Sequence, residues 1–146
     1  MQRPQLSLKG RALRYLSQRE HSRAELERKL APHAEDAAEV QRALDDLQAR
    51  GFIDHRRVAE SVVNRKAAKL GALRIKQELQ AKGLEPGLVN AALAQLKSTE
   101  LERAREVWSR KFAAPAQDAT ERARQARFLA ARGFSGEVIA RVLKGG

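Results

Sequence analysis

The 146-residue sequence contains no cysteine. Disulfides and thiolate metal sites are therefore excluded, which fits a reducing compartment. A chain of this length buries about 70% of the surface that its unfolded form exposes, so it needs no covalent cross-link to fold. The N-terminal segment lacks the apolar core of a signal peptide, and no stretch approaches the roughly 18 unbroken apolar residues of a membrane span. We therefore expect a soluble cytoplasmic protein.

Signatures of catalysis are also missing. The sequence has no Gly-rich phosphate loop, and its histidines do not form a pair at metal-ligand spacing: His21, His33 and His55. The acidic pairs at residues 35–36 and 45–46 are interpreted as solvated helix faces rather than as metal ligands. We therefore predict a non-enzymatic protein that uses no cofactor and no metal.

Aromatic residues make up only 4% of the chain. Proteins that stack the bases of single strands usually carry more of them, interleaved with basic residues. Phe52 and Phe134 each follow a glycine at the end of a helical segment, where a contact back onto the helix is expected, so we predict that both pack in the core. Trp108 is interpreted as a core residue as well. Any affinity for DNA is therefore expected to be electrostatic and weakly selective.

Basic residues are in excess, with 29 Lys and Arg against 18 Asp and Glu, which gives a formal net charge of +11. The excess is uneven along the chain, because residues 1–50 carry a net charge of +2, residues 51–98 of +5 and residues 99–146 of +4. Such a field attracts a polyanion, and nucleic acid is the usual one in the cytosol. The acidic face of a protein partner is the other candidate.

Helix-forming residues dominate the sequence. Three pairs have the spacing of a capping box, in which two side chains bond the free amides of a first turn: Ser22 with Glu25, Thr99 with Glu102 and Asp118 with Glu121. Three glycines follow a basic residue at the end of a periodic segment, where a left-handed C-cap is expected: Gly51, Gly83 and Gly133. These signals predict helices over residues 6–18, 22–31, 36–50, 54–69, 72–82, 86–97, 100–113, 119–132 and 136–144.

The apolar pattern repeats with a period of 49 to 50 residues. Three sets share one spacing: Leu30, Val40 and Leu44; Leu79, Val89 and Leu93; Leu129, Ile139 and Leu143. An apolar residue precedes each set by the same distance: Leu13, Val62 and Phe112. Each unit holds three short helices with little core of its own, so neighbouring units must pack on each other. The predicted fold is all-α, with three tandem three-helix repeats (residues 1–50, 51–98 and 99–146) in an elongated, curved array.

Two groups of basic residues are candidate contacts to a polyanion. The first lies across a predicted turn in the middle of the chain: Arg65, Lys66, Lys69, Arg74 and Lys76. The second lies in the last third: Arg103, Arg110, Arg122, Arg124 and Arg127. The alternative is that these residues are surface helix formers that pair with carboxylates such as Glu78, Glu106 and Glu121. Few acidic residues interrupt the first group, which favours a binding role for it.

Three stretches of the sequence resemble the RecX family. They are ALRYL (residues 12–16) with HSRAEL (21–26) and KL (29–30); RGFID (50–54) with RVAES (57–61); and Gly71 with RI (74–75), EL (78–79) and KG (82–83). A weaker match is FL (128–129) with RGFS (132–135) and VLK (142–144). The resemblance spans nearly the whole chain. It departs from the family pattern where an acidic pair often follows the isoleucine, because here Asp54 is followed by His55.

This resemblance implies a fold of three tandem three-helix repeats, in agreement with the repeat found in the sequence. It also implies a regulator of the RecA recombinase in DNA repair, which lodges along the groove of the RecA filament and contacts RecA and the filament's DNA. The expected effect is inhibition of strand exchange and of ATP hydrolysis.

Two other classes remain open. One is a sequence-nonspecific nucleic-acid-binding repeat protein without a RecA target, which would bind bare single strands as tightly as filaments. The other is a transcription factor built on tri-helical units, which would prefer particular DNA sequences and would dimerise. We expect a monomer, because no long apolar stripe is left over once three small cores are filled.

Overall fold

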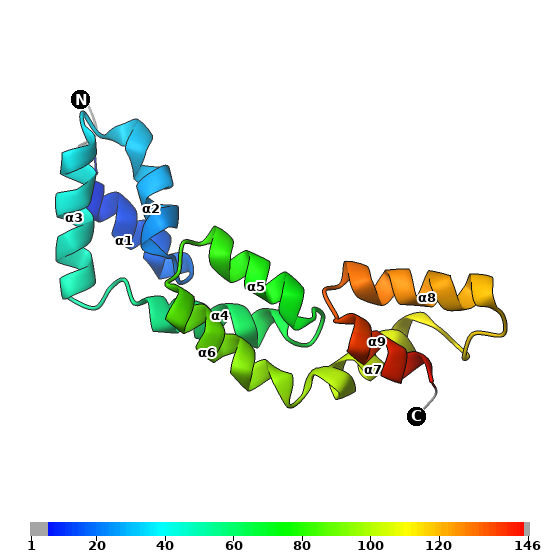
Figure 1. The fold of residues 1–146 in the computed structure, drawn as a ribbon. Coiled ribbons are helices and arrows are strands. Elements are labelled where there is room, and N and C mark those ends of the chain that lie inside the picture. Colours follow the sequence, from blue (N-terminus) through cyan, green and yellow to red (C-terminus); the bar gives the residue numbers. More distant parts are fainter. Residues whose placement is uncertain (1–5, 145–146) are drawn as a thin grey trace.

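The computed structural model describes residues 6–144, so residues 1–5 and 145–146 of the predicted end repeats lie outside the described part. Over the described residues the chain forms nine α-helices and no strand, in an elongated, curved array (Figure 1). Module 1 (residues 8–49) contains α1 (Leu8–Gln18), α2 (Arg23–Leu30), the 3-10 helix η1 (Ala31–His33) and α3 (Ala37–Ala49). Module 2 (55–97) contains α4 (His55–Lys66), α5 (Ala72–Ala81) and α6 (Pro86–Lys97). Module 3 (100–143) contains α7 (Glu100–Lys111), α8 (Ala119–Ala131) and α9 (Gly136–Leu143).

The predicted all-α fold of three tandem three-helix repeats is confirmed. The largest difference in a helix end concerns α4, which was predicted to reach residue 69 and ends at Lys66. The chain leaves the helix through a turn in which the amides of Lys69 and Leu70 both donate to the Lys66 carbonyl, at 3.0 and 2.9 Å. The predicted repeat boundaries at 50/51 and 98/99 fall between helices and remain a prediction.

The three glycine caps are confirmed. Gly51, Gly83 and Gly133 have φ angles of 82°, 73° and 94°, in the left-handed region that favours glycine. The capping boxes are confirmed only at Ser22, where the side chains of Ser22 and Glu25 bond each other's backbone amides. Asp118 caps α8 with its own carboxylate alone. Thr99 is the N-cap residue of α7, but the predicted box with Glu102 is wrong, because the Thr99 hydroxyl donates to Leu96 O at 3.3 Å instead.

Each module has its own hydrophobic core. Leu30, Leu44, Leu79 and Leu129 are fully buried, so the first residue of each repeated set lies at the centre of a core. Phe134 is 2% exposed and packs in module 3, as predicted.

Two apolar residues lie outside these cores. The prediction for Phe52 is wrong, because its side chain is 45% exposed and the next residue, Ile53, fills the core of module 1. Leu13 of the predicted upstream trio is likewise 37% exposed, and Ala12 takes the buried place. A shift of one residue at each position therefore moves the large side chain from the core to the surface.

The second helices of the modules, α8, α5 and α2, follow one another end to end along the array (Figure 1). At the junction of modules 2 and 3, the amides of Gly71 and Leu73 at the start of α5 donate to Arg132 O and Gly133 O at the end of α8, at 2.8 and 3.1 Å. The negative end of one helix dipole thus meets the positive end of the next, which is a favourable arrangement.

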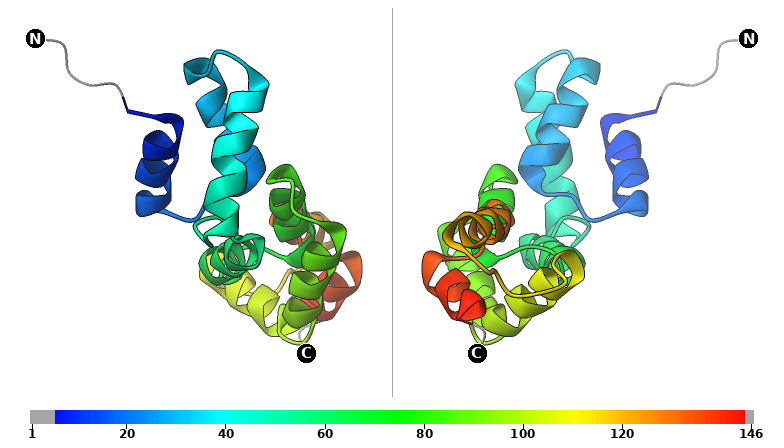
Figure 2. Two further views of the ribbon diagram at one scale, coloured as in Figure 1. Left: turned by 90° about the vertical axis from the view of Figure 1, so that its left-hand side faces the viewer. Right: turned by 90° about the vertical axis from the view of Figure 1, so that its right-hand side faces the viewer.

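The other end of α5 meets α2 in module 1. Lys82 donates to Glu25 Oε1 at 3.1 Å, and Gly83 faces Ala24 so closely that an added Cβ would lie 3.0 Å from the Ala24 Cβ. Seen along the array, module 1 tilts away from the other two modules, which lie behind one another (Figure 2). The three small cores are therefore joined by specific polar contacts at helix ends.

Candidate nucleic-acid interface

The first group of predicted contacts lies on α4, on α5 and on the turn between them. Lys69 and Lys76 are exposed, and neither has an ion pair among the described residues. Lys66 pairs with Glu78 at 3.6 Å, and Arg65 Nε donates to Ser61 O of its own helix at 3.3 Å. Lys69 and Lys76 thus keep their donors available to a ligand, while Arg65 and Lys66 make only weak surface contacts.

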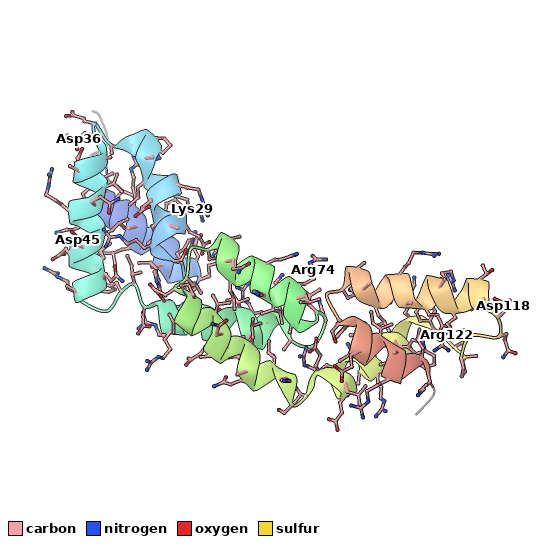
Figure 3. All side chains as sticks on the ribbon, in the orientation of Figure 1. Lys29, Asp36, Asp45, Arg74, Asp118 and Arg122 are labelled. Atoms are coloured by element: carbon pink, nitrogen blue, oxygen red, sulfur yellow. The ribbon has the colours of Figure 1, made fainter. Side chains whose placement is uncertain are left out.

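Arg74 belongs to the same group but serves the junction between modules. Its guanidinium donates to Ala131 O of α8 at 2.7 Å. Figure 3 shows the side chain at the gap between α5 and α8. Its Nη1 therefore supports the carbonyl end of α8, and only the rest of the guanidinium faces solvent.

Arg103 of the second group is also occupied within the fold. Its Nη1 donates to Ala67 O and Leu70 O at 2.8 Å each, and its Nη2 donates to Leu96 O at 3.3 Å. Burial of the guanidinium lowers the pKa of Arg103 below its ordinary value. The bonds to Ala67 O and Leu70 O satisfy carbonyls that follow the end of α4, whereas Leu96 O also accepts from the Thr99 amide. Arg103 thus fixes module 3 to module 2.

The carboxylate of Glu100 stabilises the same junction between modules 2 and 3. The side chain is buried, and its Oε1 accepts a hydrogen bond from the Ala72 amide at the start of α5 at 3.0 Å. Because Gly71 offers no side chain to cap α5, this carboxylate from the next module takes that place.

The remaining members of the second group lie along α7 and α8. Arg110 pairs with Glu106 at 3.7 Å, and Arg124 pairs with Glu121 through two bonds of 3.0 Å. Arg122 reaches Leu143 O at 3.4 Å, near the C-terminal end of the array (Figure 3). Arg127 is exposed and has no ion pair among the described residues. Pairing with carboxylates, the alternative interpretation of these clusters, therefore holds for Lys66, Arg110 and Arg124.

Two further cations, Arg132 and Lys111, lie beside members of the two predicted groups, and they were not predicted as contacts from the sequence. The guanidinium carbon of Arg132 lies 4.8 Å from the centroid of the Phe128 ring, and Lys111 Nζ lies 5.7 Å from it. With Lys69 and Arg110 they line one pocket of about 350 Å³ at the junction of modules 2 and 3. The spacing of Phe128 and Arg132 on one helix could have indicated the first contact, whereas Lys111 comes from another helix.

A second network joins modules 1 and 2. The buried Glu25 carboxylate bonds Arg19 at 2.8 Å, Lys82 at 3.1 Å and the Ser22 amide at 3.1 Å. Burial by itself raises the pKa of Glu25, but these hydrogen bonds outweigh it and lower the pKa to about 2. The carboxylate is therefore a permanent anion at neutral pH, and two cations from different modules converge on it.

Two of the three histidines have structural roles, and the third, His33, is exposed. His55 Nε2 accepts from the Arg23 amide at 3.2 Å, and its Nδ1 donates to Glu85 Oε1 at 2.8 Å, which links α2 to α6. His21 is buried, and burial lowers its pKa. Lys29 donates to its Nε2 at 2.8 Å.

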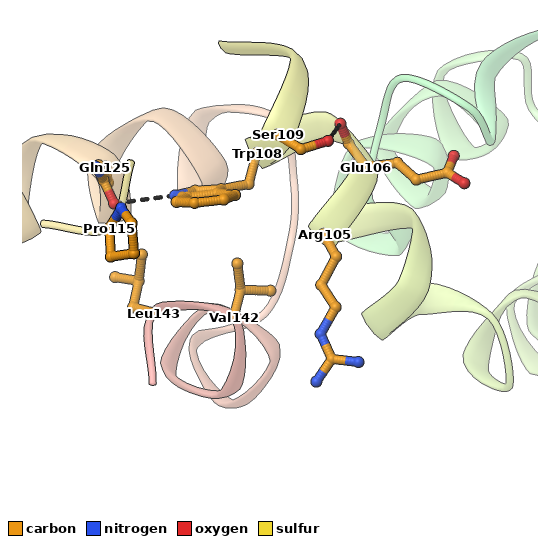
Figure 4. Close-up of a pocket in the computed structure, with 8 residues that line it drawn as sticks. All are labelled: Arg105, Glu106, Trp108, Ser109, Pro115, Gln125, Val142 and Leu143. Carbon is orange, nitrogen blue, oxygen red and sulfur yellow. Dashed lines mark hydrogen bonds between the residues drawn. The ribbon is translucent and has the colours of Figure 1, made fainter. Parts of the chain in front are cut away.

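A pocket of about 420 Å³ lies in module 3 between α7, α9 and the segment that follows α7 (Figure 4). Trp108 forms one wall and donates to Gln125 Oε1 at 2.9 Å, so it is only partly a core residue. Within residues 6–144, no group of three acidic or histidine side chains is placed to hold a metal ion. In the same part of the chain, no helix has the length and apolar character needed to cross a bilayer.

Three family models match the chain in order. They are described as RecX, first three-helix domain (residues 9–47), second three-helix domain (54–93) and third three-helix domain (98–143). A regulatory protein RecX from Leptothrix cholodnii is 60% identical over 142 residues, which cover 97% of this chain and 90% of the relative. One from Ralstonia nicotianae is 50% identical over 143 residues, which cover 98% and 90%.

Two solved structures have a similar fold. The crystal structure of RecX from Lactobacillus salivarius matches with a TM-score of 0.80 at 21% identity, over 94% of this chain and 93% of that chain. A second crystal structure of a regulatory protein RecX matches with a TM-score of 0.79 at 23% identity, over 94% and 71%. At these identities the likeness concerns the fold alone.

Proposed function

The chain belongs to the RecX family, and we propose that it inhibits the RecA recombinase by binding along the RecA–DNA filament and lowering its ATP hydrolysis and strand exchange. RecX proteins are regulatory rather than enzymatic, which agrees with the absence of catalytic motifs from this sequence. The observation that carries the proposal is the joining of three small modules into one curved, basic array by fixed contacts at both junctions. Such an array presents its cations to a long, anionic partner without first having to order its modules.

The contact strip that we propose consists of Arg65, Lys66, Lys69, Arg74 and Lys76 on module 2, extended on α7 and α8 by Arg110, Arg122, Arg124 and Arg127. Each exposed cation contributes a modest, salt-dependent amount of binding free energy. Several such contacts on connected modules raise one another's effective concentration, so affinity arises from their number rather than from one residue. We further propose that the protein acts in the cytoplasm as a monomer.

The test is DNA-dependent ATP hydrolysis by RecA on single-stranded DNA, with this protein titrated well below the RecA concentration. We expect ATP hydrolysis to fall at substoichiometric amounts, because a molecule lodged in a filament affects many protomers. A fall only when the DNA itself is saturated would contradict the proposal and favour simple competition for nucleic acid.

A double variant, Arg65→Gln with Lys76→Gln, tests the strip. Both side chains are exposed, and neither bonds another module, so folding is retained. We expect weaker inhibition and a flatter salt dependence than for the matched pair Arg42→Gln with Lys97→Gln, which removes the same charge elsewhere. Equal inhibition by both pairs would remove the strip from the proposal.

A further inference from the structure

The pocket around Phe128 differs from the rest of the basic surface in its composition. Six residues line it, and four of them are cations: Lys69, Arg110, Lys111 and Arg132, with Val107 and Phe128 as the apolar remainder. They come from the α4–α5 turn, from α7 and from the end of α8. Among the described residues no carboxylate lines the pocket, and Arg110 makes a surface ion pair with Glu106 at 3.7 Å.

Two of these four cations lie against an aromatic ring rather than a carboxylate. Arg132 and Lys111 lie over Phe128 at 4.8 and 5.7 Å from the ring centroid. Phe112 contacts the same ring edge-on at 5.3 Å and fixes its plane. A cation–π contact attracts a cation without neutralising its charge, so both side chains keep donors for an anion. A surface cation that is paired with a carboxylate, such as Arg50 with Asp46, lacks this property.

Backbone bonds of the module junction set the position of two of the four cations. The Lys69 amide bonds Lys66 O at 3.0 Å in the turn that ends α4, and Arg132 O accepts the Gly71 amide at 2.8 Å. The fold therefore brings like charges from modules 2 and 3 to one recess, where they repel each other unless an anion lies between them. A bound anion would also fasten the two modules together.

We propose that this pocket binds a phosphodiester group of single-stranded nucleic acid, with its phosphate held by Lys69, Lys111 and Arg132. Val107 and Phe128 form an apolar wall beside these cations, and the sugar or base attached to the phosphate can pack against it. Inorganic phosphate has no apolar group that could make this contact. A flexible strand can turn one nucleotide into a recess of about 350 Å³, which a stacked duplex does not allow. The site deepens the proposed function, because a RecA filament carries such a strand, and it rests on that function for its biological setting. Its binding step does not require RecA.

The experiment measures binding of a labelled oligodeoxythymidine to the full chain by fluorescence anisotropy at several salt concentrations, without RecA. At ~0.1 M salt, Lys69→Gln and Lys111→Gln should each weaken binding about fivefold and flatten the slope of log affinity against log salt by about 0.7, the value for one phosphate contact on a single strand. The matched control Lys97→Gln, an exposed lysine on α6 outside the pocket, should change the affinity less than about twofold. Circular dichroism of each variant checks that the helices are retained.

Competition separates the sources of phosphate. Unlabelled oligodeoxythymidine should displace the probe, whereas millimolar inorganic phosphate should not; displacement by phosphate alone would assign the pocket to a free anion. A duplex that binds as tightly and depends equally on Lys111 would overturn the single-strand assignment. If Lys69→Gln and Lys111→Gln lose no more affinity than Lys97→Gln, the pocket is not a binding site.

The RecA assay remains a separate readout. Inhibition of RecA, together with oligodeoxythymidine binding that does not depend on Lys69 or Lys111, would leave the proposed function standing and remove this site. Oligonucleotide binding that depends on Lys111, without any effect on RecA, would do the opposite.

Discussion

The amide of Gly71 donates to the carbonyl of Arg132 at 2.8 Å, which joins the first turn of α5 to the last turn of α8. A Cβ on Gly71 would lie within 3 Å of the backbone at Gly133, and a Cβ on Gly133 would lie 2.5 Å from the Arg74 amide nitrogen. The two helices approach this closely only because both residues are glycine. The junction of modules 2 and 3 is thus a backbone contact that no side-chain rearrangement can relieve.

Gly133→Ala should therefore destabilise the protein more than the same change at another glycine cap. Gly51 has a similar φ of 82°, but among the described residues no atom beyond its two chain neighbours lies within 4 Å of the position of its added Cβ. Gly51→Ala should cost only the left-handed backbone, about 1–2 kcal/mol, and Gly133→Ala should cost ~2–5 kcal/mol, because the clash with Arg74 adds to it. Urea denaturation followed by circular dichroism measures both. Equal losses of stability at the two glycines would show that the backbone at the junction can move to accommodate the added methyl group without loss of stability.

The pH dependence of stability should reveal the Glu25 network. The pKa of Glu25 is lowered from 4.5 to about 2, so the folded state holds the anion more strongly than the unfolded state does. This contribution is fully present above pH 4.5, and it is lost as the pH falls through the window from 4.5 to about 2. This contribution amounts to about 3 kcal/mol.

Glu25→Gln should remove most of that acid dependence and destabilise the protein at pH 7, because Arg19 and Lys82 lose the anion between them. Glu60→Gln, at an exposed position without an ion pair among the described residues, is the control and should leave the profile unchanged. The measurement is the free energy of unfolding from urea titrations between pH 2 and 7. An unaltered acid limb in Glu25→Gln would contradict the assignment.

The two phenylalanines that follow glycine caps should respond differently to truncation. Phe134→Ala should cost ~3–5 kcal/mol, because the side chain is 2% exposed in the core of module 3. Phe52→Ala should change stability by less than ~1 kcal/mol, since its side chain is 45% exposed. Thermal or urea unfolding distinguishes the two, and a large loss in Phe52→Ala would show that it supports the junction of modules 1 and 2.

Local features of the fold could be predicted from the sequence because they depend on neighbours within a few residues. The glycine caps at Gly51, Gly83 and Gly133 need a left-handed backbone that glycine adopts most easily, and the helix between each pair of signals follows from its periodicity. Ser22 with Glu25 forms its box for the same reason. Thr99 and Glu102 have the same sequence spacing, but they form no box. The end of α6 lies directly before Thr99, and the Thr99 hydroxyl donates to the Leu96 carbonyl there.

The functional surface could be predicted only as a region. Composition places the positive charge on modules 2 and 3, but it does not show which cations are already engaged. Arg103 bonds carbonyls 36 and 33 residues away, and Arg74 bonds one 57 residues away, so no local pattern marks them as structural. Lys111 and Arg132 meet over Phe128 only because α7 and α8 pack together.

The contrast between Arg103 and Arg127 gives the last prediction. Both were selected from the sequence as contacts to a polyanion, and substitution of either by glutamine removes one positive charge. Arg103→Gln should cost ~2–4 kcal/mol of stability, because the carbonyls of Ala67 and Leu70 lose their donor in a partly buried place. Arg127→Gln should change stability by less than about 0.5 kcal/mol, since the side chain is exposed.

Binding should show the reverse order when it is measured under conditions in which both variants are folded. Arg127→Gln should weaken oligodeoxythymidine binding by up to about fivefold at ~0.1 M salt, the effect of one lost phosphate contact. Arg103→Gln should retain its affinity, because its guanidinium lies against backbone carbonyls rather than in reach of a strand. Urea titrations and fluorescence anisotropy on the same two preparations give both quantities. A stable Arg103→Gln variant with impaired binding would return Arg103 to the contact surface, and it would mean that the carbonyls of Ala67 and Leu70 find other donors.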